Sequence, residues 1–185
     1  MKIILGFVGQ MASGKDTSAD YIAEKYNGKN YSFSQMLGDV LERYHLTKNR
    51  DNLVKISEAM REKFGEDILA KTMAEDVKND THDIVTISNV RRMADIKYLG
   101  QLDNFFLVKI FAEPKTRYER LIKRSEKSDD KTKTYEQFLA DHQRSTELTI
   151  EEVANTAKLT IDNNGNLEEL YSKIDDIINK IKKSV

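Results

Sequence analysis

Short apolar runs recur along this chain and predict its strands. The segment from Lys2 to Val8 is nearly all apolar, which is expected of a strand that is buried on both faces of a parallel sheet. Four further runs predict strands at 30–33, 84–88, 105–111 and 159–162. The Asn-Asn-Gly sequence at 163–165 is a strong turn signal directly after the last of these runs.

Between these runs, apolar side chains recur at the spacing of a helix face. Ala19, Ile22, Ala23 and Tyr26 share one stripe, and Gly28 follows where that helix should end. The same periodicity predicts helices over 16–26 and 34–44, two more within 50–79, and others at 91–99, 114–127, 134–147 and 167–181. Strands that alternate with helices predict an α/β fold, with a five-stranded parallel sheet that has helices on both faces.

The composition narrows the class of protein without pointing to one activity. A chain of 185 residues fits one domain, and its formal net charge of −1 gives no basic field that would attract nucleic acid or an anionic membrane. The lack of cysteine excludes disulfides, thiol nucleophiles and thiolate metal sites. The first apolar run is too short for a signal peptide, and no stretch approaches the roughly 20 apolar residues of a membrane span. We therefore expect a cytoplasmic protein without nucleic-acid or membrane partners.

A glycine-rich loop follows the first predicted strand and opens the first predicted helix. Residues 9–15 read Gly-Gln-Met-Ala-Ser-Gly-Lys, which is the Gly-x-x-x-x-Gly-Lys spacing of a phosphate-binding loop. Gly9 and Gly14 can adopt backbone angles closed to other residues, so that successive N–H groups face a polyphosphate. The helix adds its positive end, and Lys15 brings a cation to the β- and γ-phosphates. The loop therefore predicts a nucleotide site.

The expected metal ligands depart from the usual pattern in two places. In phosphate-loop enzymes a Ser or Thr that binds Mg²⁺ follows the lysine, but here Asp16 stands there and Thr17 comes next. Asp16 can hold Mg²⁺ directly or through water, or it can be only an acidic residue favoured by the helix dipole. The third predicted strand ends in Ser88 and Asn89 where an aspartate is usual. We expect Mg²⁺ at Asp16, Thr17 and Ser88.

Arginines gather after Pro114, the only proline. Arg117, Arg120 and Arg124 have spacings that reach one helix face, a charged loop follows, and Arg144 lies on the next predicted helix. Phosphoryl transfer needs cations around the moving phosphate and a cover that excludes water, so two arms that carry arginines predict a closing lid. The alternative is a solvated face of charge pairs four residues apart.

The helical region between the second and third predicted strands is too long for a simple crossover, and we expect it to bind a phosphate acceptor. Arg61 can bind an acceptor phosphate through two parallel hydrogen bonds, although a surface arginine would look the same in sequence. Arg91 follows the third strand at the functional edge, where it can touch a phosphate. The candidate acceptor-binding residues are Ser34, Asp39, Arg43, Arg61 and Arg91.

Several of these segments resemble small-molecule kinases. Residues 9–20, with their Ser-Gly-Lys-Asp-Thr loop, resemble the opening of phage-type deoxynucleoside monophosphate kinases. Ser88-Asn-Val-Arg-Arg-Met-Ala-Asp-Ile is similar to a segment of animal-type phosphomevalonate kinase, in which an Asp replaces Asn89. The stretch from Arg61-Glu-Lys-Phe-Gly to Asn163-Asn-Gly-Asn-Leu-Glu-Glu-Leu resembles archaeal adenylate-kinase-related proteins and, more distantly, dephospho-CoA kinases.

The resemblance implies a single P-loop kinase domain over 1–185 with three parts. A three-layer α/β/α core at 1–33, 81–123 and 146–185 would have the sheet order 2-3-1-4-5, with an acceptor-binding helical insertion at 34–80 and a lid at 124–145. Arg120, Arg124 and Arg144 would be lid cations, and Arg91 would contact the acceptor or the transferred phosphate. The residues implied to bind ATP are Gly9, Gln10, Met11, Ala12, Ser13, Gly14, Lys15, Asp16 and Thr17, with Asn163 and Gly165 near the adenine.

These observations predict an ATP- and Mg²⁺-dependent kinase whose acceptor is a nucleoside or deoxynucleoside monophosphate. One alternative is a dephospho-CoA kinase-like enzyme, in which a ribose hydroxyl is the nucleophile and Asp39 is the carboxylate candidate. Another is a nucleotide-binding regulatory module with little turnover, which the missing strand-end aspartate motivates. The expected assembly is a monomer or a homodimer.

Overall fold

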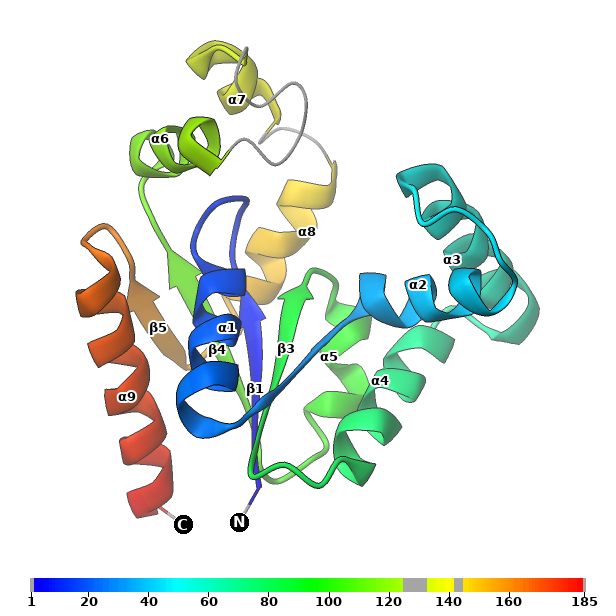
Figure 1. The fold of residues 1–185 in the computed structure, drawn as a ribbon, viewed down its shortest axis with the longest axis horizontal. Coiled ribbons are helices and arrows are strands. Elements are labelled where there is room, and N and C mark those ends of the chain that lie inside the picture. The colour runs from blue at the N-terminus through cyan, green and yellow to red at the C-terminus, as the bar shows by residue number, and fades with distance from the viewer. Residues whose placement is uncertain (1, 125–132, 142–144, 185) are drawn as a thin grey trace.

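A single parallel sheet organises the chain. The computed structural model describes residues 2–124, 133–141 and 145–184. Its strands are β1 (Ile3–Val8), β2 (Lys29–Ser32), β3 (Ile84–Val90), β4 (Phe105–Phe111) and β5 (Leu159–Asp162). They pair in parallel in the order β2-β3-β1-β4-β5, which confirms the predicted topology (Figure 1).

Helices cover both faces of the sheet, which gives the predicted three layers (Figure 1). Ile3, Leu5 and Phe7 of β1 pack with α1 and α9, whereas Ile4 and Val8 pack on the other face with α4, α5 and α8. The alternation follows from the two-residue period of a strand, and burial on both faces explains the unbroken apolar run. The helices are α1 (Lys15–Tyr26), α2 (Phe33–Arg43), α3 (Arg50–Phe64), α4 (Ile68–Asn79), α5 (Met93–Leu99), α6 (Pro114–Arg124), α7 (Tyr135–Asp141), α8 (Ser145–Ala154) and α9 (Leu167–Ser184).

The prediction of one helix over 134–147 was wrong. The structure has α7 and α8 there, and residues 142–144 between them lie outside the described part of the chain. α8 turns back to the sheet because Ile150, Val153 and Ala154 form an apolar stripe that is buried against β1 and its neighbours. This stripe belongs to none of the predicted elements, so one helix of the core was not predicted.

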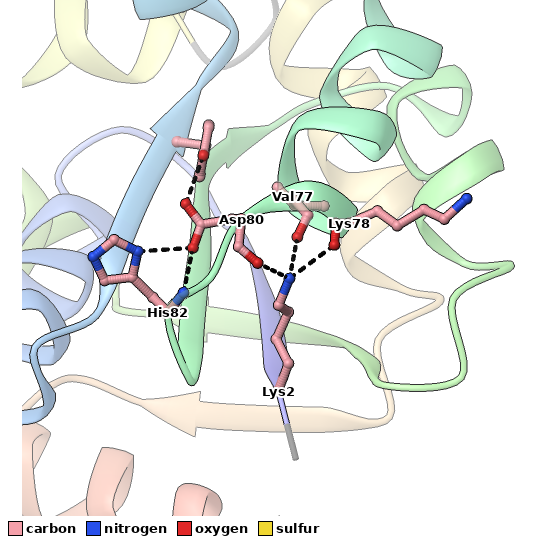
Figure 2. A network of polar contacts seen from close by, with 6 residues as sticks. Lys2, Val77, Lys78, Asp80 and His82 are labelled. Carbon is pink, nitrogen blue, oxygen red and sulfur yellow. Dashed lines mark hydrogen bonds and ion pairs between the residues drawn. The ribbon is translucent and has the colours of Figure 1, made fainter.

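We call the edge of the sheet at which the strands begin the amino edge. There the side chain of Lys2 caps the C-terminus of helix α4. Its Nζ donates to the carbonyl oxygens of Val77 at 3.0 Å, of Lys78 at 2.9 Å and of Asp80 (Figure 2). A cation at a helix C-terminus satisfies carbonyls that have no partner within the helix and complements the helix dipole. This contact fixes α4 to the start of β1.

The carboxylate of Asp80 completes the same network (Figure 2). It accepts hydrogen bonds from Tyr31 Oη at 2.8 Å and from the backbone N and Nδ1 of His82 at 2.7 and 2.8 Å. Burial raises the pKa of Asp80, but these hydrogen bonds outweigh it and leave the pKa below its ordinary value. The amino edge is therefore a polar network in which each of these groups has a partner.

A second polar cluster anchors α9 to α1. The rings of Tyr21 and Tyr171 stack with their centroids 3.9 Å apart, and Asp175 accepts hydrogen bonds from Tyr21, from Tyr26 at 2.6 Å and from Lys25 at 2.7 Å. Burial, followed by the contact with Asp175, raises the pKa of Tyr26 to about 12. Since α9 follows the turn at 163–165, this anchor fixes the turn beside the glycine-rich loop.

Candidate nucleotide site

The glycine-rich loop joins β1 to α1 at the edge where the strands end, which we call the carboxyl edge. Gly14 precedes the helix with φ 108°, in the left-handed region that favours glycine. A Cβ on Gly14 would lie 2.3 Å from Nδ2 of Asn163, which donates to the carbonyl of Ser13 at 2.8 Å. The glycine therefore lets Asn163 tie the β5–α9 turn to the loop.

Gly9 is required for a different reason. A Cβ there would lie 2.3 Å from the carbonyl oxygen of Ile110 in β4, so a side chain would force two strands apart. Within the loop, the N–H of Ser13 donates to the carbonyl of Gln10 at 3.2 Å, and Ala12 has φ 60°. Both glycines of the motif are thus explained by the backbone path.

Lys15 is buried at the start of α1, although it is charged. Its Nζ donates to the carbonyl oxygen of Gln10 at 3.0 Å, which draws the side chain back across the loop. Lys15 therefore lies beside the loop at the N-terminus of α1, which is a place where proteins commonly bind anions.

A cavity of about 920 Å³ opens in front of the loop. This volume falls within the usual range of small-molecule sites, roughly 300–1,000 Å³. Its walls come from the loop and the first turn of α1, from α6, and from the β5–α9 turn. The lining residues are Ala12, Gly14, Lys15, Asp16, Thr17, Arg120, Lys123, Asn163, Gly165, Asn166, Leu167, Glu168 and Leu170.

Arg120 is the arginine of α6 that reaches this cavity. Its Nη2 donates to the carbonyl of Gly165 at 3.0 Å, whereas its Nη1 is buried and has no hydrogen-bond partner within the part of the chain that the structure describes. Burial lowers the pKa of Arg120, but a guanidinium stays charged in a protein. A charged donor that is buried beside a phosphate-type loop fits an anionic ligand. The structure thus brings Arg120 together with the loop and with the turn at 163–165.

The side chain of Arg117 is oriented differently from what the sequence predicted. We expected it to share a helix face with Arg120, but its side chain is turned inward and is only 1% exposed. Its Nε donates to the carbonyl of Ala112 at 2.9 Å, its Nη1 donates to that of Met11 at 3.3 Å, and the guanidinium lies 5.3 Å from the ring centre of Phe138 in α7. Arg117 therefore holds the glycine-rich loop from behind.

The first turn of α1 meets the end of β3 through one polar contact. Nδ2 of Asn89 donates to Oδ1 of Asp16 at 3.1 Å, and Asn89 has φ 64°. Ser88, the residue expected to help bind Mg²⁺, is buried and pairs with Ser32 of β2 in the sheet. In the described ranges no three His, Cys, Asp or Glu side chains form a metal cluster. Mg²⁺ in kinase sites needs only one or two protein carboxylates besides the substrate phosphates, so the oxygens at Asp16 and Thr17 fit it.

On the other side of the loop, arginines gather between α3 and α5. Arg61 is half-buried and donates to Oγ of Ser57, and its pKa is lowered first by burial and then by the positive charge of Arg92. Asp95 accepts the backbone N–H groups of Arg91 and Arg92, at 3.0 Å each. Within the described residues, no ion pair joins Arg61, Arg91 or Arg92 to a carboxylate. For Arg61, the repulsion from Arg92 is larger than the attraction of the nearby Asp95 carboxylate, so an added anion suits this position.

The remaining predicted residues lie elsewhere. Ser34, Asp39 and Arg43 are exposed on α2 and do not line the large cavity, and the charge of Asp39 acts on Lys48. Helix α2 is capped by Oγ of Ser32, which accepts from the N–H of Gln35 at 3.1 Å. Gly9 and Gln10 line a smaller cavity of about 120 Å³ under the loop. The side chain of Arg124 and the whole of Arg144 lie outside the described part of the chain.

The cavity has walls that sequence reasoning missed. Asn166, Leu167 and Glu168 follow the predicted turn, and Leu167 is 57% exposed although it is apolar. The available signal was the position of this apolar residue, directly after a turn that faces the loop.

Across the described ranges, no helix combines the length and apolar character that crossing a membrane requires.

Comparison with known proteins agrees with this geometry. The model of a family described as "AAA domain" matches residues 8–138. A UPF0200 protein of Saccharolobus islandicus is 28% identical over 187 residues, which span 100% of this chain and 96% of that protein. A UPF0200 protein of Sulfurisphaera tokodaii is 28% identical over 178 residues, which span 96% of this chain and 97% of that protein.

Two solved structures share the fold. A shikimate kinase from Bacteroides thetaiotaomicron superposes with a TM-score of 0.64 at 14% identity, over 97% of this chain and 98% of that one. A shikimate kinase from Acinetobacter baumannii in complex with shikimate gives a TM-score of 0.57 at 16% identity, over 97% and 94% of the two chains. At these identities the likeness concerns the fold alone.

Proposed function

The chain belongs to the AAA domain family and has a P-loop kinase-like fold, and we propose that it transfers the γ-phosphoryl group of ATP to a nucleoside or deoxynucleoside monophosphate. The observation that carries this proposal is the buried Nη1 of Arg120, which has no hydrogen-bond partner among the described residues and lies at a cavity of about 920 Å³ lined also by Lys15. A triphosphate would supply an acceptor for this donor and could also accept hydrogen bonds from the loop amides.

On the donor side, the glycine-rich loop binds the polyphosphate and α1 directs its N-terminus at it. Lys15 and Arg120 neutralise charge as it moves toward the leaving oxygen. Asn163, Gly165 and the exposed Leu167 form the wall for the base. Mg²⁺ is held by Asp16 and Thr17, where its charge would stabilise the phosphates. The lid cations Arg124 and Arg144, and a contribution from Ser88, remain part of the proposal.

On the acceptor side, Arg61 and Arg91, with Arg92, bind the phosphate that receives the γ-phosphoryl group. An acceptor phosphate is already an anion, so its transfer needs positioning and charge neutralisation more than a general base. Asp39, the carboxylate candidate for the alternative hydroxyl acceptor, is exposed on α2. Ser34 and Arg43 would then contact the rest of the acceptor only if α2 approaches it on binding.

A second candidate function is a nucleotide-binding regulatory module with little turnover. The amide of Asn89, in place of a strand-end carboxylate, favours it. In either case we propose a cytoplasmic protein that acts on small molecules as a monomer or homodimer, without nucleic-acid or membrane partners.

Acceptor-stimulated ADP release tests the proposal. We expect a panel of nucleoside monophosphates to stimulate ADP formation. Lys15→Ala should lower the rate at least about 1,000-fold, which corresponds to an increase of about 4 kcal/mol in the activation free energy. Lys29→Ala, which removes an exposed lysine from β2, is the matched control and should leave the rate unchanged.

The other outcomes separate the candidates. ATP binding in calorimetry without stimulation by any acceptor would favour the regulatory module. Stimulation by dephospho-CoA alone would favour the hydroxyl acceptor. Folded protein that gives no binding heat with any purine triphosphate and Mg²⁺ would refute both functions.

A further inference from the structure

The contact between Asp16 and Asn89 joins the two positions at which phosphate-loop enzymes hold their metal. Those enzymes use a neutral hydroxyl directly after the loop lysine and an aspartate on the neighbouring strand. In this chain the carboxylate follows the lysine, and the neutral side chain ends the strand. Oδ1 of Asp16 and Nδ2 of Asn89 lie 3.1 Å apart.

We propose that the carboxylate and the neutral side chain have exchanged positions, which we call the exchange. Asp16 supplies the metal-binding carboxylate, and Asn89 supplies the neutral side chain that holds this carboxylate in place. This inference rests on the proposed function, because the metal is the one that accompanies ATP. It assigns to Asn89 a positioning role that the sequence pattern alone did not suggest.

The backbone of Asn89 supports this assignment. Its φ of 64° lies in the left-handed region, which residues other than glycine rarely adopt and which Asn and Asp tolerate best. Pairing between β1 and β3 is also irregular between Gly6 and Val8, beside this position. Sparsely populated backbone conformations persist where the surrounding structure demands them and are frequent at functional sites. Asn89, near the end of β3, thus places its amide against Asp16, which lines the cavity.

The charges around Asp16 show why the exchange has a measurable consequence. Burial, and then the negative charge of Asp16, raise the pKa of Asp20, so negative potential collects on this turn of α1. A triphosphate in the cavity brings further negative charge close to Asp16. A divalent cation would turn this repulsion into attraction, whereas a neutral hydroxyl at position 16 would repel nothing. Nucleotide affinity should therefore depend on Mg²⁺ mainly through Asp16.

The exchange also explains why both positions are not acidic. Two carboxylates at about 3 Å repel strongly, and one of them would take up a proton rather than share the site as an anion. A single carboxylate is thus compatible with either position 16 or position 89. Carboxylates at both positions at once are unfavourable unless a metal ion lies between them. Substituting positions 16 and 89 together should therefore restore the Mg²⁺ dependence of nucleotide affinity that a substitution of position 16 alone removes.

A double-mutant cycle tests this with a binding readout. The probe is a non-hydrolysable ATP analogue, and the measured quantity is the ratio of its Kd in EDTA to its Kd in saturating Mg²⁺. We expect a ratio of about 100 for the wild type, and of less than about 10 for Asp16→Thr, whose affinity in EDTA should rise. The double variant Asp16→Thr with Asn89→Asp should return to within about threefold of the wild type. Asn89→Asp alone should weaken binding in EDTA and increase the ratio.

A matched control keeps the cycle interpretable. Asp20→Asn removes a neighbouring carboxylate of the same helix and should change the ratio less than about twofold. Electron paramagnetic resonance of bound Mn²⁺ gives an independent measure, in which Asp16→Thr should lower the occupancy and the double variant should recover it.

Failure of the inference and failure of the proposed function give different results. If the wild type binds the analogue with a high ratio that Asp16→Thr leaves intact, or if the double variant recovers nothing, the exchange is refuted while the kinase proposal stands. If Thr17→Val abolishes the ratio while Asp16→Thr leaves it intact, Thr17 is the main ligand and the exchange is refuted again. A wild type that binds the analogue in neither condition overturns the proposed function itself.

Discussion

The two edges of the sheet differ in how completely their polar groups are paired. At the amino edge, Lys2 and Asp80 join the ends of helix and strands in a network that leaves neither without partners (Figure 2). At the carboxyl edge lie Oγ of Ser13 and Nη1 of Arg120, the two buried side-chain atoms without a hydrogen-bond partner among the described residues. An unpaired buried polar group costs stability, so its retention points to a ligand. One edge thus stabilises the fold, and the other keeps groups available for binding.

Two aspartates express the same contrast through their pKa values. Burial raises the pKa of Asp80, but hydrogen bonds from His82 and Tyr31 bring it below the ordinary 3.8. At the carboxyl edge, burial raises the pKa of Asp95 above 3.8, although the N–H groups of Arg91 and Arg92 oppose the rise. A carboxylate with a lowered pKa stabilises the fold at neutral pH, whereas one with a raised pKa opposes it.

We expect the largest effect from a substitution of Arg117. It is an exception at the carboxyl edge, because its buried side chain has hydrogen-bond partners. It is as buried as the core yet donates to the glycine-rich loop through Met11. Arg117→Met should lower the free energy of unfolding by about 3 kcal/mol, since it leaves the carbonyls of Ala112 and Met11 without these donors. It should also weaken nucleotide binding, because the loop loses its support. Urea unfolding and calorimetry measure the two effects.

Arg117→Lys separates charge from geometry in this test. A lysine keeps the charge but cannot bond both carbonyls in the planar geometry of a guanidinium, so an intermediate loss is expected. If Arg117→Met lost stability and kept the wild-type nucleotide affinity, Arg117 would belong to the core alone and the contrast between the edges would be complete.

Asp80→Ala should produce the next largest effect, and only on stability. Its loss leaves Tyr31 Oη and the N–H of His82 without their acceptor, which should cost about 2 kcal/mol in the free energy of unfolding. Nucleotide affinity should stay within about twofold of the wild type, because the site lies at the opposite edge. Asp83→Ala, an exposed aspartate of the same edge, is the matched control and should be neutral within about 0.5 kcal/mol. A loss of nucleotide affinity in Asp80→Ala would contradict this separation of the edges.

The sequence predicted most of the carboxyl edge on the donor side and little of the acceptor side. The loop from Gly9 to Lys15 could be predicted because its conformation depends on residues that are consecutive in the chain. Asn163 could be placed only through a resemblance, since its contact with Ser13 joins residues 150 positions apart. The inward turn of Arg117 was missed because spacing alone cannot say which face of a helix is buried.

The core shows the same limit. Five strands and their order followed from apolar runs and from the resemblance, and both were confirmed. α8 was missed because its buried stripe is short and follows a charged segment, so that nothing local marked its beginning. Arg92, whose charge acts on Arg61 and which we propose as an acceptor-binding residue, was not a candidate because its proximity to Arg61 depends on how α3 lies near the start of α5. Long-range packing, rather than local preference, decides these features.

The smallest expected effect is the most specific, because it predicts opposite signs for the two aspartates. Asp80 contributes stability above pH 3.8 that is lost as the pH falls through its lowered folded pKa, so Asp80→Asn should flatten the acid side of the stability profile. Asp95 binds its proton more tightly in the folded state, so stability falls as the pH rises from 3.8 through its raised pKa, and Asp95→Asn should flatten that fall.

At pH 7, Asp80→Asn should therefore lower the free energy of unfolding by about 1 kcal/mol. Asp95→Asn should leave it unchanged or raise it by up to about 1 kcal/mol, since an asparagine oxygen can still accept the N–H groups of Arg91 and Arg92. Urea unfolding of both variants from pH 3 to pH 8 measures the two profiles. Profiles that change in the same direction would show that burial acts alike at the two edges, and the contrast would then rest on Ser13 and Arg120 alone.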